Sequence, residues 1–162
     1  MIRFILGLGL SVALSACASA PPARTTQSPP PPRAPTAVSV IPSTGLAPQA
    51  LNAGECGLFL WAQTDINKLV FFSKGQTNRA VFKVADATYN LSARTYAGNV
   101  FGQFLTRMVY GDGTGGIVEL TFESGEELIG GQRIEGGLIT RTSPDGWQVK
   151  LPVLGVRACL PE

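Results

Sequence analysis

The chain has 162 residues, a formal net charge of +2 and no histidine. The absence of histidine removes the usual general base, the Ser-His-Asp and Cys-His arrangements, and the commonest metal ligand. Arg3, Arg24 and Arg33 supply the excess of positive charge and all precede the part expected to fold, so no basic face for nucleic acid is predicted. We therefore expect no catalytic residues, no metal site and no cofactor.

The first residues have the features of a secretory signal. Met1-Ile2-Arg3 carries a positive charge, and Phe4 to Leu14 follow without any charge. This apolar run is too short to cross a bilayer, which takes about 20 residues, but it has the length of a signal-peptide core. Residues 14–17 then read Leu-Ser-Ala-Cys, which resembles the lipobox of bacterial lipoproteins.

The resemblance implies that residues 1–16 are a lipoprotein signal peptide and that Cys17 carries acyl chains. A single chain anchors marginally, at about 0.8 kcal/mol per buried methylene, whereas two or three chains give stable attachment to the membrane. In the sorting rule of that class, Ala18 favours the outer membrane over the inner one. We expect a lipid-anchored outer-membrane protein that faces the periplasm. The alternative is an unmodified cysteine near an ordinary cleavage site.

Residues 17–50 hold the lipidation site and then most of the chain's 12 prolines. Because proline lacks an amide donor and restricts both its own backbone and that of the preceding residue, we expect a disordered, extended tether. At about 3.1 Å per residue, the tether would reach on the order of 100 Å when fully stretched. A second interpretation, in which residues 28–35 (SPPPPRAP) bind an aromatic-lined groove, stays open.

Residues 51–162 are expected to form a single domain built from strands. Val118, Leu120 and Phe122 alternate with Glu119 and Thr121, a period of two that is typical of strands with one buried face. The expected strands are 57–64, 68–73, 79–85, 88–95, 103–110, 117–123, 132–141, 147–151 and 153–159.

Short turn sequences separate these strands. SPDG (143–146) has proline in the second turn position and glycine in the fourth, which indicates a hairpin. GDGTGG (111–116), ESGEE (123–127) and SKGQTN (73–78) are weaker signals of the same kind. No long window has the apolar spacing of a helix. The prediction is an all-β fold, a small antiparallel barrel or sandwich of about eight or nine strands.

Cys56 and Cys159 lie at opposite ends of this domain and are the cysteines that remain once Cys17 is lipidated. An isolated pair in an oxidising compartment normally forms a disulfide. Such a bond is geometrically possible if the first and last strands are antiparallel neighbours. Two buried free thiols are the alternative. A zinc site is disfavoured, because two cysteines without histidine cannot complete a tetrahedral shell unless carboxylates join them.

Three features resemble binding or catalytic motifs, but for each of them a structural role is expected instead. GDGTGG formally matches a dinucleotide-binding pattern, but the strand-like IVELTF that follows offers no helix N-terminus for a pyrophosphate. Asp112 within it is a single carboxylate, so a hairpin turn is favoured over a calcium site. Glu119 and Glu123 fall on the polar face of a strand, where solvation is expected rather than acid–base catalysis.

Phe59, Trp61, Phe71 and Phe72 are concentrated in the first two expected strands. They are either core residues or a surface for a partner. Because adjacent strand residues point to opposite faces, Phe71 or Phe72 needs a second covering layer, a ligand or a partner. These four residues are the candidate partner surface.

The combined features predict a non-enzymatic envelope lipoprotein that binds another protein or stabilises an assembly. In architecture the chain is similar to membrane-bound lysozyme inhibitors, which are small barrel lipoproteins with a disulfide. Residues 92–98 (SARTYAG) match their Ser-Gly-x-x-Tyr binding loop only loosely. Inhibition of a lytic enzyme is therefore an alternative, and a carrier of an apolar ligand is a further one.

Overall fold

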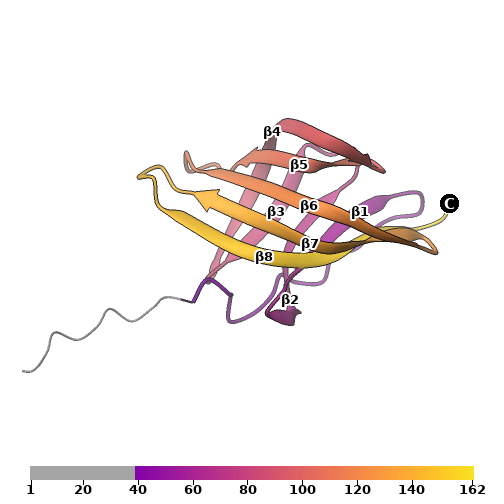
Figure 1. Cartoon of the computed structure of the whole chain (residues 1–162), viewed down its shortest axis with the longest axis horizontal. Coiled ribbons are helices and arrows are strands. Elements are labelled where there is room, and N and C mark those ends of the chain that lie inside the picture. The colour runs from indigo at the N-terminus through magenta and orange to yellow at the C-terminus, as the bar shows by residue number, and fades with distance from the viewer. Residues whose placement is uncertain (1–38) are drawn as a thin grey trace, which may run out of the picture. The chain divides into compact units, whose positions relative to one another are not determined.

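In a computed structural model, which describes residues 39–162, eight antiparallel strands form a closed barrel (Figure 1). Each strand pairs with the next along the chain, and the last strand pairs with the first. The predicted signal peptide 1–16, Cys17 and the part of the tether before residue 39 lie outside the described residues. The strands are β1 (Cys56–Ala62), β2 (Asp65–Lys74), β3 (Arg79–Val84), β4 (Ala87–Phe101), β5 (Phe104–Gly111), β6 (Ile117–Leu128), β7 (Gly131–Thr142) and β8 (Gln148–Cys159).

The barrel, rather than a sandwich, follows from the pairing of β1 with β8, which removes both free sheet edges. The alternation predicted for β6 is confirmed: Val118, Leu120 and Phe122 are buried, while Glu119 and Thr121 are partly exposed. Side chains of this kind from all eight strands fill the interior, as they do in other small barrels. The largest of the fully buried ones are Tyr110, Phe71, Phe82 and Phe101.

The strands expected at 147–151 and 153–159 form one continuous strand, β8, despite Pro152 between them. The Pro152 carbonyl accepts a hydrogen bond from the backbone N–H of Gln63, at 3.0 Å, just after β1 ends at Ala62. In an antiparallel strand the N–H and C=O of one residue face the same neighbouring strand. The N–H group that Pro152 lacks would therefore face the chain at the end of β1, so its absence does not interrupt the hydrogen bonds between β8 and β7.

An extended N-terminal segment, residues 39–51, lies along the outside of β2 and β3. The backbone N–H of Ala85 donates to the Val40 carbonyl at 2.9 Å, and that of Leu46 donates to the Leu69 carbonyl at 2.7 Å. Near the middle of the segment, the backbone N–H of Ser43 donates to Asp86 at 2.9 Å. These contacts extend the folded part beyond the boundary at Leu51 expected from the sequence. The extended conformation that proline favours suits such docking.

The two ends of the barrel differ and are named here by their residues. The disulfide end holds the start of β1, the end of β8 and the turns after β2, β4 and β6. The Asp112 end holds the turns after β1, β3, β5 and β7. Because neighbouring strands are antiparallel, every turn belongs to one end or the other.

Candidate functional site

The four aromatic residues predicted as a partner surface lie on both sides of the barrel wall. Phe71 is fully buried in the interior, where its ring meets Tyr110 edge to face at 5.8 Å. Its assignment to a partner surface is therefore wrong, because a partner on the outer wall does not reach it. Phe59, Trp61 and Phe72 lie on the other face of the same two strands. Phe59 packs against Phe72 with ring centroids 4.9 Å apart.

Phe72 is covered by the protein itself, since it is only 6% exposed although it lies outside the barrel. Leu51, Phe59 and Phe72 converge over Gly57: a side-chain carbon at this glycine would lie 2.9, 2.9 and 3.1 Å from them, respectively. The residue predicted to need a second covering layer thus obtains it from the N-terminal segment. The local sequence pattern does not predict this contact, because Leu51 lies outside the expected strands.

Phe59 and Trp61 remain partly exposed, and the apolar surface that they form extends onto β8. Phe59 is paired with Val156 and Trp61 with Leu154, and all four side chains are half-buried. The two rings stack with centroids 6.3 Å apart and an angle of 20° between their planes. Because successive strand residues alternate between faces, the four form an apolar surface on the outer wall of β1 and β8.

A hollow of about 490 Å³ adjoins this surface and is lined by Leu128, Leu154 and Val156, with Arg133 and Glu135 as its charged residues. Leu128 is 39% exposed. Gly155 also lines the hollow, and a side chain at this position would overlap the Phe59 carbonyl oxygen and the buried Leu60 of the adjacent strand. The name β1–β8 patch is used below for Phe59, Trp61, Leu154, Val156 and Leu128.

Leu128, Leu154 and Val156 were not among the predicted site residues. For β8, the signal was the nearly continuous apolar run LPVLGV (151–156), in which both faces of the strand carry apolar side chains. Residues 56–62 (CGLFLWA) and 69–72 (LVFF) form similar apolar runs. Only the register between β1 and β8 shows that the outward residues of these two runs lie side by side.

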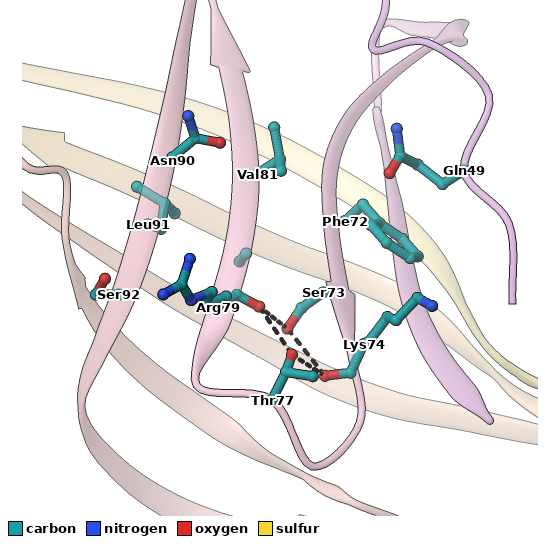
Figure 2. A pocket seen from close by; sticks show the side chains of 11 residues that line it. Gln49, Phe72, Ser73, Lys74, Thr77, Arg79, Val81, Asn90, Leu91 and Ser92 are labelled. Atoms are coloured by element: carbon teal, nitrogen blue, oxygen red, sulfur yellow. Dashed lines mark hydrogen bonds between the residues drawn. The ribbon is translucent and has the colours of Figure 1, made fainter.

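A second hollow, of about 320 Å³, lies on the outer wall of β2, β3 and β4 (Figure 2). Phe72 and Val81, which pair across strands, supply its apolar lining, and Gln49 belongs to the N-terminal segment. Lys74 also lines it, with its ammonium 2.7 Å from the Glu55 carboxylate. The hydrogen bond from Lys74, followed by that from the Asn52 backbone, lowers the pKa of Glu55 to about 2.

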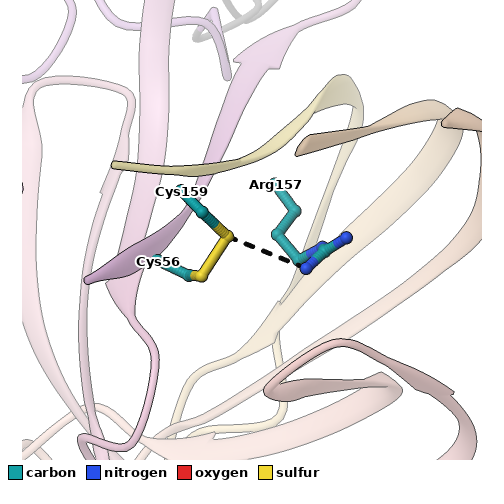
Figure 3. Close-up of a disulfide and its surroundings, with 3 residues drawn as sticks. All are labelled: Cys56, Arg157 and Cys159. Carbon is teal, nitrogen blue, oxygen red and sulfur yellow. Dashed lines mark hydrogen bonds between the residues drawn. A yellow bond between two sulfur atoms is a disulfide. The ribbon is translucent and has the colours of Figure 1, made fainter. Parts of the chain in front are cut away.

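The predicted disulfide between Cys56 and Cys159 is confirmed, with an S–S distance of 2.06 Å (Figure 3). The two residues are directly paired between β1 and β8, as the prediction of antiparallel neighbouring strands required. Arg157 lies beside the bond, with its Nη1 3.8 Å from Cys159 Sγ and its guanidinium 5.5 Å from the Phe101 ring centroid. The bond therefore closes the barrel covalently at this end.

At the opposite end, GDGTGG forms the turn between β5 and β6, as predicted. One oxygen of Asp112 accepts hydrogen bonds from the Thr114 backbone, the Thr114 hydroxyl and the Gly116 backbone, at 2.9, 2.8 and 2.8 Å. The other oxygen accepts two from Arg141, at 3.0 and 2.7 Å. Burial alone would raise the pKa of Asp112, but these hydrogen bonds outweigh it and lower the pKa below its ordinary value of 3.8.

Arg141 also lies over the Tyr89 ring, 4.2 Å from its centroid, which adds a cation–π contact inside the barrel. The Asp112 carboxylate is thus occupied in holding its own loop to β7. Across residues 39–162, no group of three or more histidine, cysteine, aspartate or glutamate side chains is placed to hold a metal ion.

The chain matches no protein-family model, no curated protein and no solved structure. Within residues 39–162, no helix is long and apolar enough to span a membrane.

Proposed function

We propose that this protein is a non-enzymatic lipoprotein of the cell envelope, whose β domain binds a protein partner through the β1–β8 patch. The observation that carries the proposal is that half-buried Phe59, Trp61, Leu154 and Val156 gather on one outer wall. Apolar surface of this kind, bordered by charged residues such as Arg133 and Glu135, is typical of protein–protein contacts.

The barrel interior disfavours a carrier of an apolar ligand, and strand β4 disfavours an inhibitor of a lytic enzyme. Side chains such as Phe71, Phe82 and Met108 fill most of the barrel interior, which disfavours an apolar cargo at its centre. Residues 92–98, compared above with the binding loop of lysozyme inhibitors, lie within strand β4 rather than in a loop. A protein partner on the outer wall needs neither an empty interior nor that loop.

The membrane attachment in this proposal comes from the lipobox-like residues 14–17. Acyl chains on Cys17 would hold the protein at the outer membrane, on the periplasmic side, and the proline-rich residues that follow would give the domain its reach. Mass spectrometry of the mature amino terminus should find a lipid-modified Cys17. A mature protein with an unmodified amino end, released in the soluble fraction of broken cells, would contradict this part.

The chain offers a matched pair of tryptophans for testing the patch. Trp61 lies in the patch, whereas Trp147 is 78% exposed in the turn between β7 and β8. With a photo-crosslinking residue at Leu154 and an affinity tag after Glu162, intact cells should yield one discrete crosslinked protein. Trp61→Ala should reduce its recovery by about tenfold or more, since buried tryptophans dominate binding energy at interfaces, and Trp147→Ala should leave recovery unchanged.

A crosslinking residue at Thr121, on the outer wall of β6, provides the positional control. If Thr121 and Leu154 capture the same proteins equally, or if neither captures any, the patch is not the binding surface. Equal loss of recovery in the Trp61 and Trp147 variants would lead to the same conclusion. Circular dichroism of each variant separates loss of binding from loss of fold.

A further inference from the structure

A separate cavity, of about 320 Å³, opens at the disulfide end of the barrel. It lies where the turn after β2 meets the turn after β4: a side-chain carbon at Gly75 would lie 3.2 Å from Gln103 Cβ. Its volume is at the lower end of the range for small-molecule sites. The lining residues that carry the argument are Gln76, Asn78, Tyr96, Gln103, Met108 and Tyr110.

The floor of the cavity presents a buried hydroxyl group with a weak partner. Tyr110 is 1% exposed, and its hydroxyl donates to Met108 Sδ at 3.3 Å. A thioether sulfur is a weak acceptor, and the Ser73 hydroxyl is a second partner for the Tyr110 hydroxyl. Burial raises the pKa of Tyr110 well above its usual value, and the nearby Ser73 hydroxyl offsets this only in part. The group is therefore a neutral donor and acceptor at the bottom of the cavity.

The walls carry amide groups. Asn78 Oδ1 accepts a hydrogen bond from the Tyr96 hydroxyl at 3.2 Å, which leaves the Asn78 amide hydrogens available as donors. Gln76 and Gln103 add two further amides. Gln76 has a φ of 61°, a left-handed conformation that is strained for a residue with a side chain and that glycine adopts freely. Strained residues of this kind are enriched at ligand sites.

The charges at the cavity do not favour an ionic ligand. Its charged lining residue, Lys74, is already paired with Glu55 at 2.7 Å, so the cavity does not require an anion. What remains is a set of amides and phenols that donate and accept, beside apolar walls from Tyr96, Phe104 and Leu105. A sugar ring has the complementary features, with hydroxyl or amide groups at its edge and C–H groups on its face.

We propose that this cavity binds a neutral, amide-bearing saccharide of one or two rings. The site is independent of the protein partner proposed above, because it opens at the disulfide end between β2–β3 and β4–β5, whereas the β1–β8 patch lies on the outer wall. The two proposals can therefore fail separately.

Calorimetric titration of the full-length protein with N,N′-diacetylchitobiose tests the site, in a detergent without a sugar headgroup. Saturable binding at millimolar or lower concentration is expected. Tyr96→Ala and Asn78→Ala should each weaken it by about tenfold, which corresponds to about 1.4 kcal/mol. Gln148→Ala, which removes an exposed amide at the opposite end, should leave binding unchanged.

Gln76→Gly distinguishes binding from folding. This change relieves the left-handed strain at position 76, so the thermal midpoint should stay the same or rise, while binding should weaken through loss of the amide. The deacetylated, positively charged disaccharide should bind more weakly than the acetylated one. No saturable binding of diacetylchitobiose, tighter binding of the charged sugar, or unchanged affinity in all three cavity variants would overturn the proposal.

Discussion

At the disulfide end, Cys56 and Cys159 join the first and last strands covalently, whereas at the Asp112 end a carboxylate and an arginine join a loop to β7. The ionic connection requires burial: the Asp112 side chain is 0% exposed and that of Arg141 13%, with Tyr89 packed on the guanidinium. The covalent bond has no such requirement, because it does not depend on exclusion of water.

Different pairs of turns pack together at the two ends of the barrel. At the Asp112 end, the turn after β5 packs toward the turn after β7, where a side-chain carbon at Gly115 would lie 3.4 Å from Pro144. At the disulfide end, the turns after β2 and β4 meet at Gly75 and Gln103 above the cavity. Variants at each end, and one on the exposed outer wall, test this difference.

Removal of the disulfide is expected to have the largest effect. The bond closes a loop with a sequence separation of 103, for which the chain-entropy relation gives about 4–5 kcal/mol. The double variant Cys56→Ala/Cys159→Ala should lose about that much free energy of unfolding in urea titrations. A loss below about 1 kcal/mol would mean that β1–β8 pairing alone keeps the barrel closed.

Asp112→Ala should have the next largest effect, a loss of roughly 3 kcal/mol in the free energy of unfolding. The substitution leaves the mostly buried Arg141 without its anion and leaves backbone donors of Thr114 and Gly116 unpaired. Urea titration again measures the effect. If the double variant Asp112→Ala/Arg141→Met is more stable than Asp112→Ala, the cost arises from the unpaired charge rather than from the loop.

Acid should weaken the Asp112 end progressively. Asp112 has a pKa below its ordinary value of 3.8 in the folded protein, so the unfolded state binds the proton more readily. Its contribution to stability is therefore complete above about pH 5 and is lost as the pH falls through the lowered pKa. The urea concentration at the unfolding midpoint of the wild type should decrease as the pH is lowered below 4. For Asp112→Asn the same decrease should be less steep. Parallel curves would assign the acid sensitivity to other carboxylates.

Glu55 and Asp86 also have lowered pKa values, so part of the acid sensitivity belongs to them. Glu55 lies near the disulfide end, paired with Lys74, and Asp86 holds the N-terminal segment through Ser43. The comparison of Asp112→Asn with Glu55→Gln at the same pH values distinguishes the two ends. If both variants show the same reduction in the pH dependence of the urea midpoint, the two ends of the barrel do not differ in acid sensitivity.

The smallest effect is expected for Glu119→Ala on the outer wall. Glu119 pairs with Arg107 at 2.7 Å, but the two side chains are 36% and 57% exposed. Exposed pairs contribute little, because water and salt screen them, so the loss should stay within about 0.5 kcal/mol. A loss as large as that of Asp112→Ala would show that burial is not what distinguishes the Asp112 end.

Much of the fold was predictable where the information is local. The period of two in β6 predicted which residues face inward, and the SPDG turn predicted a hairpin at residues 143–146. The same local rule fails for the expected strand 147–151, where a period of two would place Trp147 on the inward face with Val149 and Leu151. The structure places Trp147 in the turn itself, 78% exposed, because β8 begins only at Gln148.

The candidate site was predictable only in part. Adjacent Phe71 and Phe72 had to face opposite ways, and the sequence pattern could not decide which one is inside or what covers the other. Register and the N-terminal segment decided both: Phe71 entered the core, and Leu51 covered Phe72. Leu154 and Val156 joined Phe59 and Trp61 through a pairing between the two ends of the domain, about which a local pattern holds no information.

The sequence by itself determined the strand-forming pattern, the turns, the cysteine pair and the lipobox-like residues before the domain. These features depend on the chemistry of neighbouring residues, which the chain specifies directly. Tertiary structure alone decided that the sheet closes, that an outer patch forms and that a cavity remains at the disulfide end. Those features depend on contacts between residues far apart in the chain, and the free energy of such contacts depends on how all eight strands pack together.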